Sequence, residues 1–259
     1  MKLPEFSLVK WYMDCVTEAG ESTILYCGVL RWCGIRVSMG SLLTSHGLLA
    51  ETHSSLGSYR LSTDDGEILV EHPGLKVSGK WRADAEPFKR TVYDSPAGMV
   101  EWNCLQPRSL VNLCIGDRLV TGLGYAECLT LTVPPWQLPM HQLRWGRFVS
   151  QRDSLAWIDW QGEYSTSFAV FNGQPCEPLS VSDSEIVLGV GTLRMQDSLS
   201  LRSGRLGTTI LPGVGALSKL LPLSLFNVSE QKWRSRGTLR GSDRESDGWV
   251  IHEVVDWEV

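Results

Sequence analysis

An acidic and a phenolic side chain lie two residues apart near the middle of the chain. Tyr125 and Glu127 belong to segment 122–127, which has the composition of a β-strand. Because side chains alternate between the two faces of a strand, we expect both to point to one face, the interior of a β-barrel. A buried carboxyl group is costly unless it is paired or used. Glu127 is therefore the first candidate for a catalytic residue.

The chemistry that such an acid offers is proton transfer. Burial raises the pKa of a carboxyl group and can keep it protonated near neutral pH, which the protonation of an alkene requires. Aromatic rings such as Trp102 and Tyr125 would stabilise the resulting carbocation through their π faces, by roughly 2 kcal/mol each when desolvated. Water or a second double bond would then complete a hydration, an isomerisation or a cyclisation, and no cofactor is needed.

A structural role for the same residues is the alternative. Glu127 could form a buried salt bridge with Arg144 or Arg147, as a single carboxylate in a barrel often does. Tyr125 and Trp102 are also residue types that commonly fill a β-rich core. The eleven tryptophans of the chain fit either a packed core or a cavity for a hydrophobic ligand.

Composition argues against several classes of protein. The 259 residues carry a formal net charge of -5, which is unlike a nucleic-acid-binding protein. The basic segment from Lys232 to Arg244 contains Asp243, and acidic residues follow it, so we interpret it as a solvated strand face. The seven cysteines are dispersed, and no cysteine or histidine set has metal-ligand spacing. Without a signal peptide or an apolar run of about 18 residues, we expect a cytoplasmic protein.

Most of the chain reads as short β-strands separated by turn residues. Asp64-Asp65-Gly66 predicts a hairpin turn, because glycine supplies a positive φ, and Asn172-Gly173 predicts a turn. Helical spacing is confined to Val214 to Leu221, which we interpret as one short helix or turn.

The prolines between Pro134 and Pro139 mark a connection near the middle of the chain, because proline cannot occupy a central strand. We therefore predict a first β domain over residues 1–142 and a second over residues 143–259. Many short strands at this spacing are typical of barrels and sandwiches.

Five short segments together resemble one protein family. The segments Trp11 to Asp14, Trp102 to Pro107 and Gly124 to Glu127 are similar to segments of the AttH-like proteins. This family is related to hydroxyneurosporene synthase, the carotenoid 1,2-hydratase. The segments Trp145 to Phe148 and Trp157 to Trp160 resemble the opening strands of the family's second domain.

The resemblance implies an all-β fold of two tandem lipocalin-like antiparallel barrels or sandwiches packed together, with little helix. In the hydratases, a carboxylic acid in a Tyr-x-Asp segment protonates an isoprenoid double bond, and water captures the cation. By this resemblance Glu127 takes the position of the acid and Tyr125 that of the tyrosine. Trp102 takes the position of the tryptophan in a His-x-Trp pair, whereas the histidine position falls on Val100.

Trp11 and Trp136 are further candidates for substrate binding, since tryptophan stacks on flat apolar surfaces. We therefore predict an acid-catalysed hydratase, isomerase or cyclase acting on an isoprenoid- or polyene-like substrate, without a metal or other cofactor. A carrier for a hydrophobic small molecule and a purely structural module are the alternatives. Such a ligand is compatible with transient contact with a membrane surface, and the sequence leaves the oligomeric state open.

Overall fold

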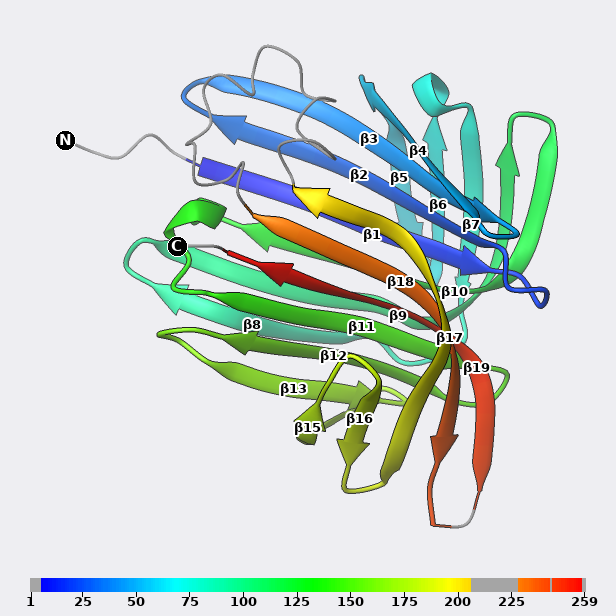
Figure 1. Ribbon diagram of the computed structural model, residues 1–259. Coiled ribbons are helices and arrows are strands. Elements are labelled where there is room, and N and C mark those ends of the chain that lie inside the picture. Colours follow the sequence, from blue (N-terminus) through cyan, green and yellow to red (C-terminus); the bar gives the residue numbers. More distant parts are fainter. Residues whose placement is uncertain (1–5, 206–227, 243, 258–259) are drawn as a thin grey trace. The chain divides into compact units, whose positions relative to one another are not determined.

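The computed structural model describes residues 6–205, 228–242 and 244–257, which form two units (Figure 1). Unit 1 comprises Met1–His46 and Glu51–Leu138, and unit 2 comprises Gly47–Ala50 and Pro139–Val259. Each unit contains one antiparallel sheet, and the helical turns in the described ranges are two short 3-10 turns. The predicted all-β fold is confirmed. The helix or turn expected at residues 214–221 lies outside the described residues.

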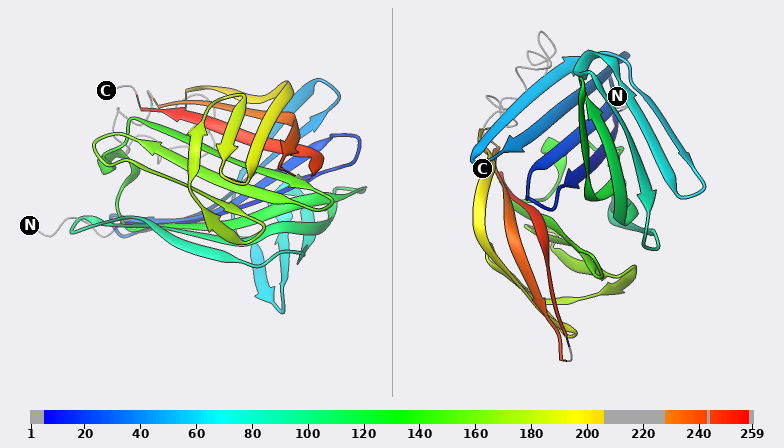
Figure 2. Two further views of the ribbon diagram at one scale, coloured as in Figure 1. Left: turned by 90° about the horizontal axis from the view of Figure 1, so that it is seen from below. Right: turned by 90° about the vertical axis from the view of Figure 1, so that its right-hand side faces the viewer.

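Unit 1 holds a ten-stranded sheet in the order β4-β3-β2-β1-β10-β9-β7-β6-β5, and β8 pairs with β9 beside this series. The sheet curves into a nearly closed barrel (Figure 2). Its elements are β1 (Phe6–Val16), β2 (Ser22–Trp32), β3 (Ile35–His46), β4 (Leu49–Leu56), β5 (Arg60–Asp64), β6 (Glu67–His72), η1 (Pro73–Leu75), β7 (Val77–Ala83), β8 (Phe88–Ser95), β9 (Gly98–Ile115), β10 (Arg118–Leu131) and η2 (Pro135–Gln137).

Unit 2 holds a nine-stranded sheet in the order β14-β13-β12-β11-β19-β18-β17-β16-β15. Its first strand lies between its second and its last, as β1 lies between β2 and β10 in unit 1. Its strands are β11 (Gln142–Ser150), β12 (Ser154–Gln161), β13 (Thr166–Phe171), β14 (Gln174–Cys176), β15 (Pro178–Val181), β16 (Glu185–Leu188), β17 (Gly191–Arg205), β18 (Ser229–Arg240) and β19 (Glu245–Asp256).

The two predicted turns are confirmed by their backbone angles. Asp65 and Gly66 have φ values of 44° and 74°, and they join β5 to β6. Asn172 and Gly173 have φ values of 48° and 78°, and they join β13 to β14. Positive φ at both central residues matches the right-handed twist of the flanking strands, which explains why these residue types occur there.

Apolar side chains fill the interior of unit 1. They include Met13 on β1, Trp81 on β7 and Ala126 on β10, and all three are fully buried. The indole Nε1 of Trp81 donates a hydrogen bond of 2.8 Å to the carbonyl oxygen of Asp14, so this polar group is satisfied inside the barrel. The equivalent core of unit 2 is built around Phe148 and Trp157.

Two glycines allow β10 to approach β1 closely. A Cβ atom on Gly124 would lie 2.0 Å from the carbonyl oxygen of Asp14, and one on Gly122 would lie 2.2 Å from that of Val16. No side chain fits at such distances, so this Gly-x-Gly pattern serves strand packing.

Candidate active site

The side chains of Tyr125 and Glu127 lie on the face of β10 that points away from the core of unit 1. Ala126, between them, belongs to that core, and its neighbour on β1 is Met13, another core residue. Because faces alternate along a strand, Tyr125 and Glu127 occupy the opposite face. The prediction that they share a face is confirmed, and the prediction that this face is the barrel interior is wrong. The interior is occupied by packed apolar side chains such as Trp81.

Two hydrogen-bond donors converge on one oxygen of Glu127. The Trp102 indole Nε1 donates to Oε2 over 2.5 Å, and the Tyr125 hydroxyl donates to the same Oε2 over 2.6 Å. Trp102 and Tyr125 are fully buried, and Glu127 is 5% exposed. Hydrogen bonds to a carboxylate stabilise its charged form, so these two donors favour the state that Glu127 reaches after giving up a proton.

The phenol beside Glu127 remains a donor at neutral pH. Burial raises the pKa of Tyr125 well above its ordinary value, and the nearby Cys104 and Glu127 raise it further. Burial also raises the pKa of the Cys104 thiol, which hydrogen-bonds with Tyr125. Tyr125 therefore keeps its proton and can hold Glu127 in place through a cycle of proton transfer.

A local irregularity in the pairing of β9 and β10 lies at this position. Gly124 pairs with Ser109, whereas Glu127 pairs with Cys104, and the register shifts on both sides of Ala126. Between these pairs β9 has more residues than β10, and Pro107 is one of the extra residues. A proline is tolerated there because a hydrogen bond between the strands is already lost. Bulges of this kind redirect side chains and are frequent beside active sites.

A second pair of a phenol and a carboxyl group lies beside the first. The Tyr12 hydroxyl donates to Asp14 Oδ2 over 2.8 Å, and both residues are buried. In the pairing of β1 with β10, Tyr12 is opposite Glu127 and Asp14 is opposite Tyr125. The four side chains therefore alternate acid and phenol on one face of the sheet.

The sequence did not lead us to assign roles to Tyr12 or Asp14. A sequence pattern that points to them exists, because Tyr12 and Asp14 have the same Tyr-x-acid spacing as Tyr125 and Glu127. It becomes informative only when β1 and β10 are known to be neighbours, and pairing between strands so far apart in the chain is not encoded locally.

Aromatic rings surround the two acids. Tyr12 makes edge contacts with Tyr125 and Tyr26, with ring centroids 5.9 and 5.3 Å apart. Phe88 on β8 contacts the Trp102 ring at 5.9 Å in the same geometry. A face that combines carboxyl groups with several π systems suits a substrate that develops positive charge on carbon.

The other predicted binding residues do not all gather here. Val100 is buried two residues before Trp102 on β9, so it shares the face of Trp102. Trp11 packs against the core of unit 1, on the opposite face of β1 from Tyr12. Trp136, in η2, packs against Phe6 and Trp32 with centroid distances of 5.8 and 5.1 Å. Phe6 is six residues along β1 from Tyr12, or about 20 Å at strand spacing. Val100 therefore lies on the same face as Trp102, the partner of Glu127. Trp11 and Trp136 lie elsewhere.

The two arginines considered as partners of Glu127 belong to β11 in unit 2. Arg144 Nε donates to Asp183 Oδ1 over 3.1 Å, and Arg147 Nη1 donates to the carbonyl oxygen of Trp249 over 2.7 Å. A salt bridge from either arginine to Glu127 stays a prediction.

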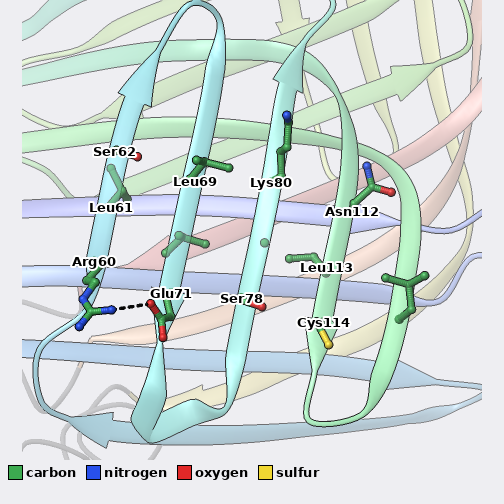
Figure 3. A pocket seen from close by; sticks show the side chains of 13 residues that line it. Arg60, Leu61, Ser62, Leu69, Glu71, Ser78, Lys80, Asn112, Leu113 and Cys114 are labelled. Carbon is green, nitrogen blue, oxygen red and sulfur yellow. Dashed lines mark hydrogen bonds and ion pairs between the residues drawn. The ribbon is translucent and has the colours of Figure 1, made fainter.

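Two surface depressions of unit 1 lie away from these residues. The larger, of about 490 Å³, is lined by residues of β5, β6, β7, β9 and β10, including Leu69, Lys80 and Asn112 (Figure 3). The Arg60–Glu71 ion pair lies at one end of it. Neither this depression nor a second one of about 380 Å³ is lined by Glu127, Tyr125 or Trp102. Their position gives no support to a ligand site connected with the acid.

Histidines and cysteines form no metal centre in the part of the chain that the structure describes, where no three potential ligands converge. His46 binds Glu21, and His53 lies 3.7 Å from Glu51. Both are surface pairs.

His252 in unit 2 is expected to make the protein less stable in acid. Burial lowers its pKa to about 4, and its Nε2 lies 2.9 Å from the Ser235 hydroxyl. The unfolded chain, with a histidine pKa of about 6.5, binds this proton more readily than the folded chain. The stabilising contribution of about 3 kcal/mol is therefore complete above about pH 6.5 and disappears as the pH falls toward 4.

Replacement by glutamine checks this expectation. His252→Gln retains a hydrogen-bonding group for Ser235 but cannot titrate, so the loss of stability between pH 6.5 and 4, measured by urea unfolding, should shrink by about 3 kcal/mol. The exposed His53→Gln is the control and should leave the pH profile unchanged. Equal profiles for His252→Gln and the unmodified protein would contradict the assignment.

The architecture of the chain is that of the AttH-like double-lipocalin proteins. Over 98% of this chain and 93% of the other, it matches an AttH protein (NE1406) from Nitrosomonas europaea with a TM-score of 0.64 and 7% identity. It matches CghA, crystallised with Sch210972, over 98% and 89% of the two chains, with a TM-score of 0.57 and 12% identity. Kievitone hydratase from Nectria haematococca matches over 97% and 90%, with a TM-score of 0.55 and 9% identity.

These likenesses confirm the predicted resemblance at the level of the fold. No family model and no curated protein sequence matches the chain. At such low identities the shared fold leaves the reaction to be argued from the residues themselves.

Proposed function

We propose that this protein is a cofactor-independent enzyme that protonates a hydrophobic isoprenoid- or polyene-like substrate, with Glu127 as the acid. The observation that carries the proposal is the buried carboxyl group of Glu127, held through Oε2 by Trp102 and Tyr125. Hydration, isomerisation and cyclisation all begin with this step. The names of two structural relatives, a hydratase and a protein crystallised with a small molecule, support a reaction or binding site of this kind.

In this proposal each group has a definite role. Oε2 already accepts two hydrogen bonds, so in the neutral acid the transferable proton is on Oε1. Transfer to a substrate carbon leaves a carboxylate, which the Trp102 and Tyr125 donors stabilise. The rings of Tyr12, Tyr125 and Trp102 stabilise the cation through their π faces.

The second acid can complete the reaction. Asp14 is held by Tyr12 on the same face and lies diagonally across the strand pair from Glu127. As a carboxylate it would accept a proton from an attacking water, giving hydration, or from a carbon next to the cation, giving isomerisation or closing a ring. Val100, where the hydratases carry histidine, adds an apolar surface to this face.

A carrier of a hydrophobic ligand is the second candidate. It is favoured by the burial and aromatic content of the same face, which would also hold a ligand that never reacts. The cytoplasm is the proposed location for either function. The absence of any disulfide among the seven cysteines, all of them in the described ranges, is compatible with that compartment.

Incubation in deuterated water distinguishes the two functions. The purified protein is mixed with a lipid extract in D₂O, and recovered lipids are analysed by mass spectrometry. An acid-catalysed enzyme places a deuterium from solvent on carbon, in a product that has gained water or in an isomer. A ligand that is retained without any carbon-bound deuterium would overturn the enzyme and support the carrier.

A further inference from the structure

A lysine lies on the same face of the unit 1 sheet as the two acids. Lys10 precedes Tyr12 by two residues on β1, so their side chains point to one face. The Lys10 Nζ lies 5.7 Å from the centroid of the Tyr26 ring, and the Tyr26 ring contacts the Tyr12 ring at 5.3 Å. Because the Tyr12 hydroxyl binds Asp14, an unbroken series of contacts joins the ammonium group to the proposed catalytic face.

This face becomes more open towards Lys10. Tyr12 is 2% exposed, whereas Lys10 and Tyr26 are only partly buried. Gly28 is the residue opposite Lys10 on β2. A Cβ atom at Gly28 would make ordinary contacts, the nearest at 3.4 Å, so packing does not require a glycine there. The missing side chain instead leaves space beside the Lys10 side chain.

The charge of Lys10 is not neutralised in the part of the chain that the structure describes, where the lysine forms no ion pair. Glu127 and Asp14, the acids of this face, accept hydrogen bonds from indole and phenol groups instead. A positive charge here would repel the carbocation that protonation of a double bond creates. Lys10 would therefore slow the proposed reaction unless the substrate itself supplied a negative charge.

We propose that Lys10 binds an anionic end group of the substrate, a carboxylate or a phosphate, and that the substrate is an amphiphilic prenyl or polyene chain. This role rests on the proposed function of Glu127. The contact with the Tyr26 ring leaves N–H donors of the ammonium group for the oxygens of the anion. Lys10 and Tyr12 are about 7 Å apart along β1, so the anionic end binds close to the reacting double bond.

Binding of a polyene acid and of its methyl ester tests the site without any turnover. The probes are cis-parinaric acid, a conjugated tetraene with a carboxyl group, and methyl cis-parinarate, and both are titrated by fluorescence. We expect the acid to bind about tenfold more tightly than the ester, because only the acid forms a charge-assisted hydrogen bond. Lys10→Met should remove this difference by weakening the binding of the acid, while the ester binds as before.

Two further variants make the test specific. Lys10→Arg keeps the positive charge and should keep the preference for the acid. Lys89→Met removes a lysine that already pairs with Glu101, so the preference should change less than about twofold. Equal binding of acid and ester by the unmodified protein, or an equal loss of both ligands in Lys10→Met, would overturn the inference.

Competition against bound cis-parinaric acid identifies the anionic group. Farnesoic acid, farnesyl phosphate and farnesol carry the same prenyl chain with a carboxylate, a phosphate and a neutral hydroxyl group. Displacement at the lowest concentration by farnesoic acid indicates a carboxylate, and by farnesyl phosphate a phosphate. Displacement by farnesol at concentrations as low as those of either anion would contradict a role for charge.

These measurements separate this inference from the proposed function. Glu127→Gln should retain the preference for the acid, because binding at Lys10 requires no proton transfer. If the preference depends on Lys10 but no deuterium reaches carbon in D₂O, the anion site stands and the proposed function fails. If deuterium transfer to neutral lipids proceeds equally in Lys10→Met and the unmodified protein, the proposed function stands and this inference fails.

Discussion

Replacing Glu127 with glutamine is expected to lower the rate of deuterium transfer to carbon by about 10²–10⁴-fold, the usual contribution of a general acid. The amide cannot donate a proton to an alkene, but its oxygen can still accept hydrogen bonds from Trp102 and Tyr125. The fold should therefore persist while the chemistry is lost. The measurement is the mass-spectrometric assay in D₂O, with near-ultraviolet circular dichroism to verify tertiary packing.

Glu101→Gln is the matched control for this substitution. Glu101 precedes Trp102 on β9, but it is only partly buried and pairs with Lys89 at 2.9 Å. Its replacement should leave the rate within about twofold of the unmodified protein, since exposed ion pairs contribute little. Glu127→Asp should retain part of the activity, because the acid is present but displaced by one methylene group.

The same variant also decides between the catalytic and the structural role of Glu127. A buried salt bridge with an arginine would make Glu127→Gln destabilising by about 3–5 kcal/mol, because an uncompensated charge would remain. If the variant is about as stable as the unmodified protein but has lost turnover, the result supports Glu127 as the catalytic acid. Retained turnover would contradict the proposed function.

Local patterns predicted the strands and turns more successfully than the strand partners. The φ requirements at Asp65-Gly66 and Asn172-Gly173 are properties of single residues, so composition reveals them. The segments 99–106 and 109–115 are separated by Pro107 and Arg108, and a proline normally ends strand pairing. They form the single strand β9, in which the bulge opposite β10 accommodates the proline.

The candidate site was predictable in part for the same reason. Tyr125 and Glu127 share a face by alternation along one strand, and Trp102 was found by the family resemblance. Which face of β10 packs against the core depends on all the strands of the barrel. The two faces of β10 differ too little in hydrophobicity for its sequence alone to show this. Ala126 is small enough to be missed as a core residue, so the interior was assigned to the wrong side.

Lys232→Met is expected to destabilise the protein by about 3–5 kcal/mol, the usual cost of removing one partner from a buried ion pair. The Lys232 side chain is 1% exposed and contacts Glu253, with Glu230 at 3.7 Å. Its ammonium group also lies 5.5 Å from the centroid of the Trp145 ring. Methionine fills a similar volume but leaves the charge of Glu253 without its cation. Urea unfolding measures the loss, and Arg240→Met, at an exposed pair with Glu245, should cost less than about 1 kcal/mol.

A double substitution separates the missing charge from the changed packing. If the cost comes from an uncompensated carboxylate, then adding Glu253→Gln to Lys232→Met should recover a large part of the lost stability. Glu230 would keep its partner, because Arg202 Nη2 lies 2.5 Å from Glu230 Oε1. No recovery in the double variant would mean that Lys232 stabilises unit 2 through the packing of its methylene groups, and that the ion pair itself contributes little.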